Sequence, residues 1–220
     1  MAFQPSERLY GVRRHALMEL LRERGIKDER VLEAMGRVRR HVFMDEALRY
    51  RAYHDVALPI GSGQTISQPF TVAFQTACLA PQPGERILEI GTGSGYQAAV
   101  LAELDVRLFS VERHQELSSR ASSLLRELGY RVTTRCGDGS KGWTAFAPYD
   151  GIIVTAGAPT VPEALRAQLR VPTESRPGGR MLIPVGARQG QTMQRVTRTG
   201  PDTYQEEELG TFRFVPLVGE

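Results

Sequence analysis

The sequence after residue 80 alternates short apolar segments with longer amphipathic ones, and this alternation limits the fold more than any other feature. Short runs rich in branched and aromatic residues predict strands, whereas the segments between them have the apolar spacing of helices. Strands separated by such helices require right-handed crossovers and a parallel sheet that is covered on both faces. The expected strands are residues 86–90, 107–112, 131–135, 149–155 and 180–185, with helices at 96–103, 114–128 and 162–169 and further edge strands at 193–198 and 204–214. We therefore predict a doubly wound α/β fold with a mostly parallel sheet.

The first 80 residues have a different, largely helical character. Residues 8–48 have helical periodicity, with Gly25 ending one helix and Asp28 resembling the N-cap of the next. Residues 57–63 are rich in proline and glycine and predict a loop, and Pro69 is expected in the first turn of the following helix. The apolar stripe predicted for the first helix is Val12, Ala16, Met18, Leu20 and Leu21.

Composition excludes several classes of protein. With 220 residues, of which 41% are hydrophobic and 24% charged, the chain can bury a sizeable core. No window has the ~18–20 uninterrupted apolar residues of a membrane helix, and the N-terminus lacks the layout of a secretion signal. Cys78 and Cys136 are too few for a disulfide scaffold, and the four histidines form no ligand cluster. We expect a cytoplasmic protein with no membrane contact and no bound metal.

The charge pattern gives little support to nucleic-acid binding. The net charge is only +3, and arginines crowd the first 55 residues together with interleaved aspartates and glutamates. Such mixed-sign segments are typical of solvated helix faces, with a nucleic-acid surface as the alternative. We expect no nucleic-acid partner.

A glycine-rich turn lies between the first expected strand and the helix that follows it. Gly91, Gly93 and Gly95 allow a tight turn that brings the backbone close to a ligand. The spacing differs from the Gly-x-Gly-x-x-Gly pattern of dinucleotide sites, because Tyr96 occupies the position of the last glycine. A tight turn without any ligand is the alternative for such a motif on its own.

Acidic residues at the ends of successive strands favour a ligand site over an empty turn. Glu89 lies just before the glycine loop, Glu112 ends the second strand, and Asp138 and Gly139 follow the third. These positions share the carboxyl edge of the sheet, where ligands bind. Carboxylates suit a cationic ligand without phosphate, so S-adenosylmethionine is favoured over a nicotinamide. We expect Glu112 to bind the ribose hydroxyls, and Asp138 to accept from the adenine amine beside Gly139.

The segment Val-Ala-Leu-Pro-Ile-Gly-Ser-Gly-Gln-Thr-Ile-Ser-Gln-Pro (residues 56–69) resembles the signature loop of protein-L-isoaspartate O-methyltransferases. The resemblance runs through nearly the whole chain from about Val12. Departures are a long connection at residues 169–178 and an added segment of about ten residues at the N-terminus. Further matching segments are residues 86–97, 110–113, 137–139, 149–156, 182–186 and 213–217.

This resemblance implies a Rossmann-like class I methyltransferase fold and particular roles for residues of the loop. Ser67 is implied to be the catalytic-site serine, with Thr65, Ile66 and Val215 lining the isoaspartyl pocket. The residues alone leave another role open for Ser67, because a serine before Pro69 also suits the N-cap of the helix expected at 70–79.

The implied reaction transfers a methyl group from S-adenosylmethionine to the free α-carboxylate of isoaspartyl residues in damaged proteins. The carboxylate is already ionised at neutral pH, so no strong general base is required. The resulting ester is implied to close to a succinimide and so to begin repair. A nucleic-acid methyltransferase is a rival, although residues 155–159 lack the aromatic residue that would hold a flipped base. A non-catalytic binding module and a nicotinamide oxidoreductase are further alternatives.

The sequence suggests two regions within one structural unit. Residues 1–80 are expected to form a helical extension and substrate loop that pack on the core. Residues 81–220 are expected to form the cofactor-binding methyltransferase core. The expected partners are isoaspartyl-containing proteins and peptides, and the expected state is a monomer.

Overall fold

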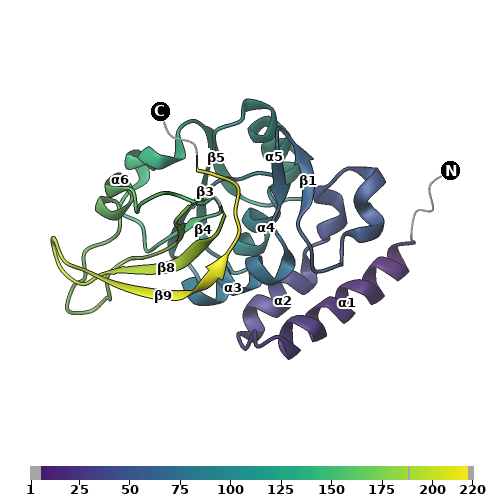
Figure 1. The fold of residues 1–220 in the computed structure, drawn as a ribbon, viewed down its shortest axis with the longest axis horizontal. Coiled ribbons are helices and arrows are strands. Elements are labelled where there is room, and N and C mark those ends of the chain that lie inside the picture. Colours follow the sequence, from purple (N-terminus) through teal and green to yellow (C-terminus); the bar gives the residue numbers. More distant parts are fainter. Residues whose placement is uncertain (1–5, 188, 218–220) are drawn as a thin grey trace.

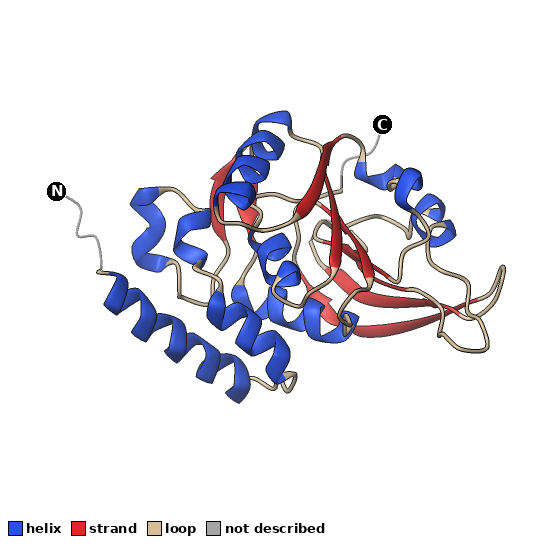
Figure 2. Cartoon of the chain, turned by 180° about the vertical axis from the view of Figure 1, so that it is seen from behind, coloured by secondary structure: helices blue, strands red, loops and turns tan. Residues whose placement is uncertain are grey.

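Among residues 6–187 and 189–217, which the computed structural model describes, a seven-stranded sheet forms the centre of the fold, with helices on both sides (Figures 1 and 2). The strand order is β5-β4-β3-β6-β7-β8-β9. In this order the first five strands, from β5 across to β7, pair in parallel. Strands β8 and β9 add antiparallel pairs at one edge. The strands are β3 (Arg86–Ile90), β4 (Arg107–Glu112), β5 (Val132–Cys136), β6 (Gly151–Val154), β7 (Arg180–Val185), β8 (Gln191–Arg198) and β9 (Tyr204–Phe212). The predicted doubly wound, mostly parallel sheet is therefore confirmed.

The buried strands divide their side chains between two hydrophobic clusters. Ile87 belongs to the cluster that contains residues of α1 to α5, whereas Leu88 and Ile90 belong to the cluster around α6. This alternation is the period of two that places successive strand residues on opposite faces. The helices are α1 (Glu7–Glu23), α2 (Glu29–Arg37), α3 (Pro69–Leu79), α4 (Tyr96–Ala102), α5 (Gln115–Glu127) and α6 (Glu163–Ala167), with 3₁₀ turns η1 (Arg40–Phe43), η2 (Glu46–Arg51), η3 (Gly139–Lys141) and η4 (Thr144–Phe146).

Over residues 6–51, the helical extension is divided into two α-helices and two 3₁₀ turns, more segments than the sequence pattern predicted. The Asp28 carboxylate accepts from the Arg30 N–H at 3.1 Å and caps α2, as expected. The predicted stripe of α1 is only partly correct, because Val12 is 61% exposed. The side chains of α1 that the fold buries are Tyr10, Leu17, Met18 and Leu21. Packing against α2 therefore selected a face rotated from the predicted one.

Residues 57–63 were predicted to form a loop. In the structure they instead contribute to a two-stranded hairpin. Strand β1 (Leu58–Gly61) pairs antiparallel with β2 (Gln64–Ile66). Leu58 and Ile60 are buried while Pro59 and Gly61 are exposed, which is the alternation of a strand. Pro59 made the segment resemble a loop in the sequence. A proline is nevertheless tolerated in such a short peripheral pair of strands.

The helical extension and the sheet share one hydrophobic cluster. Leu21 of α1 and Met35 of α2 belong to the same cluster as Ile87 of β3. The buried Arg40 side chain lies over the ring of Tyr96, 4.8 Å from its centroid, at the start of α4. Within the described part of the chain, the helices lack the length and apolar character needed to cross a membrane.

Candidate active site

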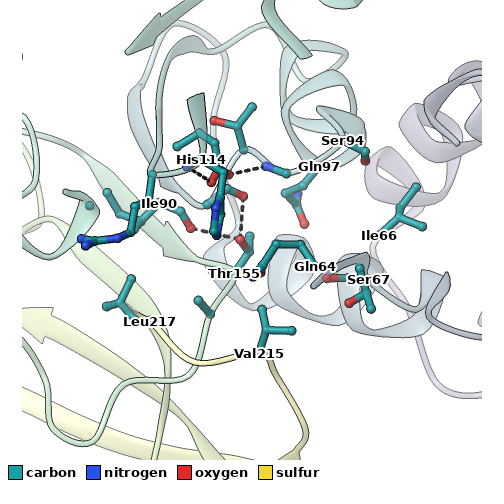
Figure 3. Close-up of a pocket in the computed structure, with 18 of the residues that line it drawn as sticks. Gln64, Ile66, Ser67, Ile90, Ser94, Gln97, His114, Thr155, Val215 and Leu217 are labelled. Atoms are coloured by element: carbon teal, nitrogen blue, oxygen red, sulfur yellow. Dashed lines mark hydrogen bonds between the residues drawn. The ribbon is translucent and has the colours of Figure 1, made fainter. Parts of the chain in front are cut away.

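A cavity opens at the carboxyl ends of β3, β4 and β6 (Figure 3). Its walls come from the glycine loop after β3, the end of β4, the residues around β2 and the segment 215–217. This is the edge at which doubly wound sheets bind their ligands. Of the residues predicted from the sequence, those that line the cavity are Thr65, Ile66, Ser67, Gly91, Gly93, Glu112, Gly139 and Val215. Glu89, Gly95 and Asp138 are not among the lining residues.

The glycine loop has a backbone that side chains would not permit. Gly91 has a φ of 94°, and a Cβ there would lie 2.4 Å from Thr155 Oγ1. The Thr155 hydroxyl lies 2.7 Å from the Gly91 carbonyl oxygen, to which it donates. Gly95 has a φ of 89° at the N-cap of α4, against Leu125 of α5. Thr155 and Leu125 thus fix the two ends of the loop.

Glu112 connects β4 to the glycine loop. Its Oε2 accepts from the Gly93 N–H at 2.8 Å, and its Oε1 accepts from the His114 N–H at 2.9 Å. The residue is only 5% exposed, so these two bonds fix its carboxylate at the pocket wall. An acid held in this way is available to accept hydrogen bonds from adjacent hydroxyl groups.

Glu89 lies fully buried beneath the loop. Its Oε2 accepts from the Ser110 hydroxyl at 2.5 Å, and Ser110 also lies 2.5 Å from the Thr92 hydroxyl. Its Oε1 has no hydrogen-bond partner in the described structure. Burial raises the pKa of Glu89 to about 8, with the Ser110 bond opposing the rise and the charge of Glu112 adding to it. Among these residues, Thr92 lines the cavity and is linked to Glu89 through Ser110.

Asp138 organises the turn that follows β5. Its Oδ1 accepts from the Ser140 N–H at 2.9 Å and from the Ser140 hydroxyl at 2.7 Å. The next residue, Gly139, lines the cavity and packs on Ile90, where an added Cβ would lie 2.4 Å from Ile90 Cγ2. Gly139 therefore keeps this wall close to the floor formed by Ile90.

The segment from β2 to α3 brings Thr65, Ile66 and Ser67 to the cavity. Figure 3 shows Ile66 and Ser67 on this side of it. Val215 joins them from the C-terminal segment, where its carbonyl oxygen accepts from the Gly157 N–H at 2.8 Å. Among the described residues, the Ser67 side chain makes no hydrogen bond.

The N-terminal cap of α3 comes from Asp55, a residue outside the predicted cap position. Asp55 Oδ1 accepts from the Phe70 N–H at 2.8 Å, and Oδ2 accepts from the Gln68 side chain at 3.0 Å and pairs with Arg24. The capping alternative for Ser67 is therefore not realised, because its place is taken by a carboxylate. The Ser67 hydroxyl is left available at the cavity.

Gln97 presents an unpartnered acceptor at the cavity wall. The Thr76 hydroxyl donates to the Val72 carbonyl oxygen at 2.7 Å, so it can only accept from Gln97 Nε2, 3.0 Å away. The Gln97 amide oxygen is therefore turned away from Thr76, and it is buried without a partner. Gln97 is 7% exposed and lines the cavity.

The position of Gln97 along the sheet edge indicates whether S-adenosylmethionine fits the cavity. Gly139 follows β5 at one end of the cavity, whereas Gln97 contacts α3, which packs near β6 and β7. If the adenine lies beside Gly139 and the ribose beside Glu112, the amino-acid part of the donor reaches Gln97. Its ammonium group supplies the donor that the buried amide oxygen lacks. The residues present fit this molecule.

Several lining residues were not predicted from the sequence. Thr155 follows the apolar run of β6, and Gln97 precedes an apolar run in the first turn of α4; these positions were the available signal. His114 also lines the cavity, two residues beyond Glu112. In the part of the chain that the structure describes, no group of His, Cys, Asp and Glu is arranged to hold a metal ion.

The fold and the cavity together define a class I methyltransferase with a Rossmann-like sheet. A solved protein-L-isoaspartate O-methyltransferase superposes with a TM-score of 0.82 at 29% identity, over 94% of this chain and 66% of that one, so the match spans about two thirds of the solved chain. A β-aspartate methyltransferase from Plasmodium falciparum, solved with S-adenosyl-L-homocysteine, has the same fold, with a TM-score of 0.79 at 24% identity over 92% of this chain and 97% of that one.

The sequence comparisons define the family. The family described as protein-L-isoaspartate (D-aspartate) O-methyltransferase matches residues 12–220. The protein-L-isoaspartate O-methyltransferase of Salinibacter ruber is 62% identical, over 100% of this chain and 98% of the relative. That of Cytophaga hutchinsonii is 51% identical, over 94% and 91%. The chain belongs to this family and is an S-adenosylmethionine-dependent methyltransferase, which confirms the resemblance found in the motifs.

Proposed function

We propose that this protein methylates the free α-carboxylate of L-isoaspartyl residues in damaged proteins and peptides, and that the predicted site residues that line the cavity have the roles predicted from the sequence. The observation that carries the proposal is the placement of Ser67 in the same cavity as Gly91, Glu112 and Gly139. A donor site and an acceptor hydroxyl thus face one another across one cavity.

The donor half of the site consists of groups suited to a cationic nucleoside. Gly91 and Gly93 give the ligand close access to the backbone, and Glu112 accepts from the ribose hydroxyls. Gly139 packs beside the adenine, while Asp138 holds the turn that carries Gly139. We assign Glu89 and Gly95 to supporting the loop from below, because neither lines the cavity.

The acceptor half orients a carboxylate that is already a nucleophile. The Ser67 hydroxyl donates to the isoaspartyl carboxylate, and Thr65, Ile66 and Val215 surround it. When bound, S-adenosylmethionine supplies the methyl group on a positively charged sulfur. Ser67 and the walls of the cavity hold the acceptor oxygen in line with that carbon and exclude water. Positioning of this kind contributes about 7–11 kcal/mol in well-oriented reactions.

The sparse polarity of the acceptor half suits the charge change of the reaction. A carboxylate and a sulfonium become a neutral ester and thioether, so charge disappears along the reaction path. A site with several fixed charges would stabilise the reactants more than the transition state. One hydroxyl beside Ile66 and Val215 orients the carboxylate with little such penalty. The amide nitrogen of the following residue then displaces methanol from the ester to give a succinimide, which water reopens in part as normal aspartate.

We also propose where the protein acts, in which oligomeric state and on which partners. The protein acts as a cytoplasmic monomer on isoaspartyl-containing chains, without nucleic-acid or membrane partners. The division near residue 80 marks two parts of one unit: a helical extension with the substrate loop at 1–80 and the methyltransferase core at 81–220. Leu21 and Ile87 lie in one shared cluster, which supports the packing of the two parts as a single unit.

A labelled-methyl assay tests the function directly. An isoaspartyl peptide is compared with the same sequence containing normal aspartate, with labelled S-adenosylmethionine as donor. Base-labile label is expected on the isoaspartyl peptide alone. Equal label on both peptides, or transfer to added RNA or DNA in their place, would overturn the proposal.

A further inference from the structure

A second cavity continues outward from the acceptor half of the site. It has a volume of about 400 Å³ and lies between the start of α3 and the end of β9. Four of its lining residues, Thr65, Ser67, Thr155 and Val215, also line the first cavity. A chain whose isoaspartyl group is held at Ser67 must leave the site, and this groove is continuous with that position.

The floor of the groove is aromatic and well supported. Phe70, Phe212 and Phe214 line it, and Phe74 lies between two of them, with ring centroids 6.0 Å from Phe70 and 4.9 Å from Phe212. These rings are partly buried against the large hydrophobic cluster. The backbone at Phe214 is fixed as well, because the Phe214 N–H donates to Gln191 Oε1 at 2.9 Å. The groove is therefore formed by packed elements of the fold.

The charge of the lining is one-sided. The chain as a whole has 28 Lys and Arg and 25 Asp and Glu residues, yet the groove is lined by two arginines and no carboxylate. Arg24 is paired with Asp55 and lies over the Phe70 ring, 4.4 Å from its centroid. Arg213 is exposed and, within the described residues, makes no hydrogen bond or ion pair. One uncompensated positive charge thus borders the groove.

We propose that this groove binds the residues that flank the isoaspartyl group in the substrate chain, and that Arg213 gives it a preference for an acidic residue in that flank. The proposal rests on the function proposed above. The aromatic floor accommodates the apolar parts of the flank, whereas Arg213 forms an ion pair with an aspartate or glutamate at the groove edge. The occupant is a carboxylate-bearing peptide segment, because an uncompensated guanidinium repels a basic one.

The test uses a set of isoaspartyl peptides in which one flanking position carries Glu, Gln or Lys and all other positions are constant. The kcat/KM is measured for each of three positions on either side of the lesion. At the position that reaches Arg213, the Glu peptide is expected to exceed the Lys peptide by about two- to five-fold at low ionic strength, as exposed ion pairs do. The ratio falls towards one in 0.5 M salt, because solvent-exposed charges are screened there.

Two variants separate Arg213 from general charge effects. Arg213→Glu is expected to invert the preference, so that the Lys peptide becomes the better substrate. Arg107→Gln provides the matched control, because Arg107 is exposed at the opposite end of β4 from Glu112 and its loss leaves the ratio unchanged. Thermal unfolding and S-adenosylhomocysteine binding confirm that both variants are folded.

The outcomes distinguish the two proposals. If no isoaspartyl peptide is methylated, the proposed function fails. If all isoaspartyl peptides are methylated with equal kcat/KM whatever the flanking charge, the function stands and the groove proposal is overturned. A charge preference that persists unchanged in Arg213→Glu also overturns it, since another residue would then be responsible.

Discussion

The Asp55 carboxylate accepts a hydrogen bond from the Phe70 backbone N–H at 2.8 Å, and so caps a helix that begins 14 residues later, at Pro69. The same carboxylate binds the Gln68 side chain and pairs with Arg24 of the helical extension. Asp55 therefore fixes the acceptor segment from outside the cavity. It also leaves the Ser67 hydroxyl free of the capping role that the sequence allowed.

Replacing Asp55 is expected to weaken substrate binding as well as stability. Asp55→Ala removes the cap and leaves Arg24 unpaired, so we expect a loss of about 1–2 kcal/mol in unfolding free energy and a raised KM for isoaspartyl peptide. Asp55→Asn retains an acceptor for the Phe70 N–H and should restore part of both. Denaturant unfolding and steady-state kinetics measure these effects.

Asp28 provides the control for Asp55. It caps α2 through the Arg30 N–H at 3.1 Å and does not line the cavity. Asp28→Ala should lower stability by a similar amount and leave the peptide KM unchanged. Equal changes in peptide KM for the two variants would contradict a positioning role for Asp55.

Loss of the Ser67 hydroxyl is expected to impair methyl transfer without affecting donor binding. A hydrogen bond to a charged group contributes about 1.5–3 kcal/mol, which corresponds to roughly a 10- to 150-fold fall in kcat/KM for the peptide in Ser67→Ala. Calorimetry should give an unchanged affinity for S-adenosylhomocysteine. Ser123→Ala, on the exposed face of α5, is the control. Full activity in Ser67→Ala would remove this residue from the site.

Gln97 is expected to contribute to binding of the donor's ammonium group. Gln97→Leu removes the unpartnered amide oxygen, and the affinity for S-adenosylhomocysteine should fall about tenfold or more, the scale of a hydrogen bond to a charged group. An analogue that lacks the amino group should bind both proteins with similar affinity. Titration calorimetry on the four combinations gives the coupling between the side chain and the amine. Additive losses would place the amine elsewhere.

The wall at Gly139 should not tolerate a methyl group. In Gly139→Ala the Cβ would meet Ile90 Cγ2 at 2.4 Å, so the turn must move away from the floor of the site. We expect weaker S-adenosylhomocysteine binding and a loss of about 1–3 kcal/mol in stability, the range for overpacking. Gly11→Ala in α1 is the contrast, because nothing lies within 4 Å of its Cβ position. It should stabilise the protein by about 0.5–1 kcal/mol, as thermal unfolding can show.

The buried Glu89 should make stability depend on pH. Its pKa is raised to about 8, whereas a carboxyl group in the unfolded chain titrates near ~4.3. The folded state therefore holds the proton more tightly. This contribution is complete below the unfolded pKa and is lost as the pH rises to about 8.

Glu89→Gln removes that titration. The Tm of Glu89→Gln relative to the unmodified protein should rise steadily between pH 5 and pH 8 and then level off. Glu127→Gln, an exposed change on α5, should give a constant difference. Thermal unfolding across this range without ligand is the measurement, and a flat difference for Glu89→Gln would show that the buried carboxyl is not protonated.

The sheet was predictable because its signals are local. The run from Arg86 to Ile90 contains Ile87, Leu88 and Ile90 and lies between Gly84 and Gly91, and the structure begins and ends β3 at the predicted residues. The bounds of β4 and β7 also match the prediction, whereas ends of β5, β6, β8 and β9 differ by a residue or two, as at β5, where pairing with β4 sets the limits. The positions of Glu112 and Gly139 at one cavity followed from the common carboxyl edge of parallel strands.

What could not be predicted depends on contacts between distant segments. No local pattern joins Asp55 to Phe70, because the bond forms only when α3 packs beside the residues before β1. In the sequence, Gln97 is one polar residue of an alanine-rich helix. Only the fold brings Thr76 to it, and the Thr76 hydroxyl accepts from the Gln97 side-chain nitrogen. Similarly, Glu89 was expected to face the ligand, but the pleat of β3 directs it into the interior with Ser110.

The hydrogen bonds between Gly157 and the C-terminal segment affect the order in which the parts of the site can form during synthesis. Gly157 donates to the Val215 carbonyl oxygen and accepts from the Leu217 N–H at 2.7 Å, so a wall of the acceptor pocket comes from residues made after β9. Proteins emerge from the ribosome with the N-terminal part first. A growing chain can form the glycine loop and the Glu112 contact before Val215 exists, so the acceptor pocket is completed only after residues 215–217 have been made.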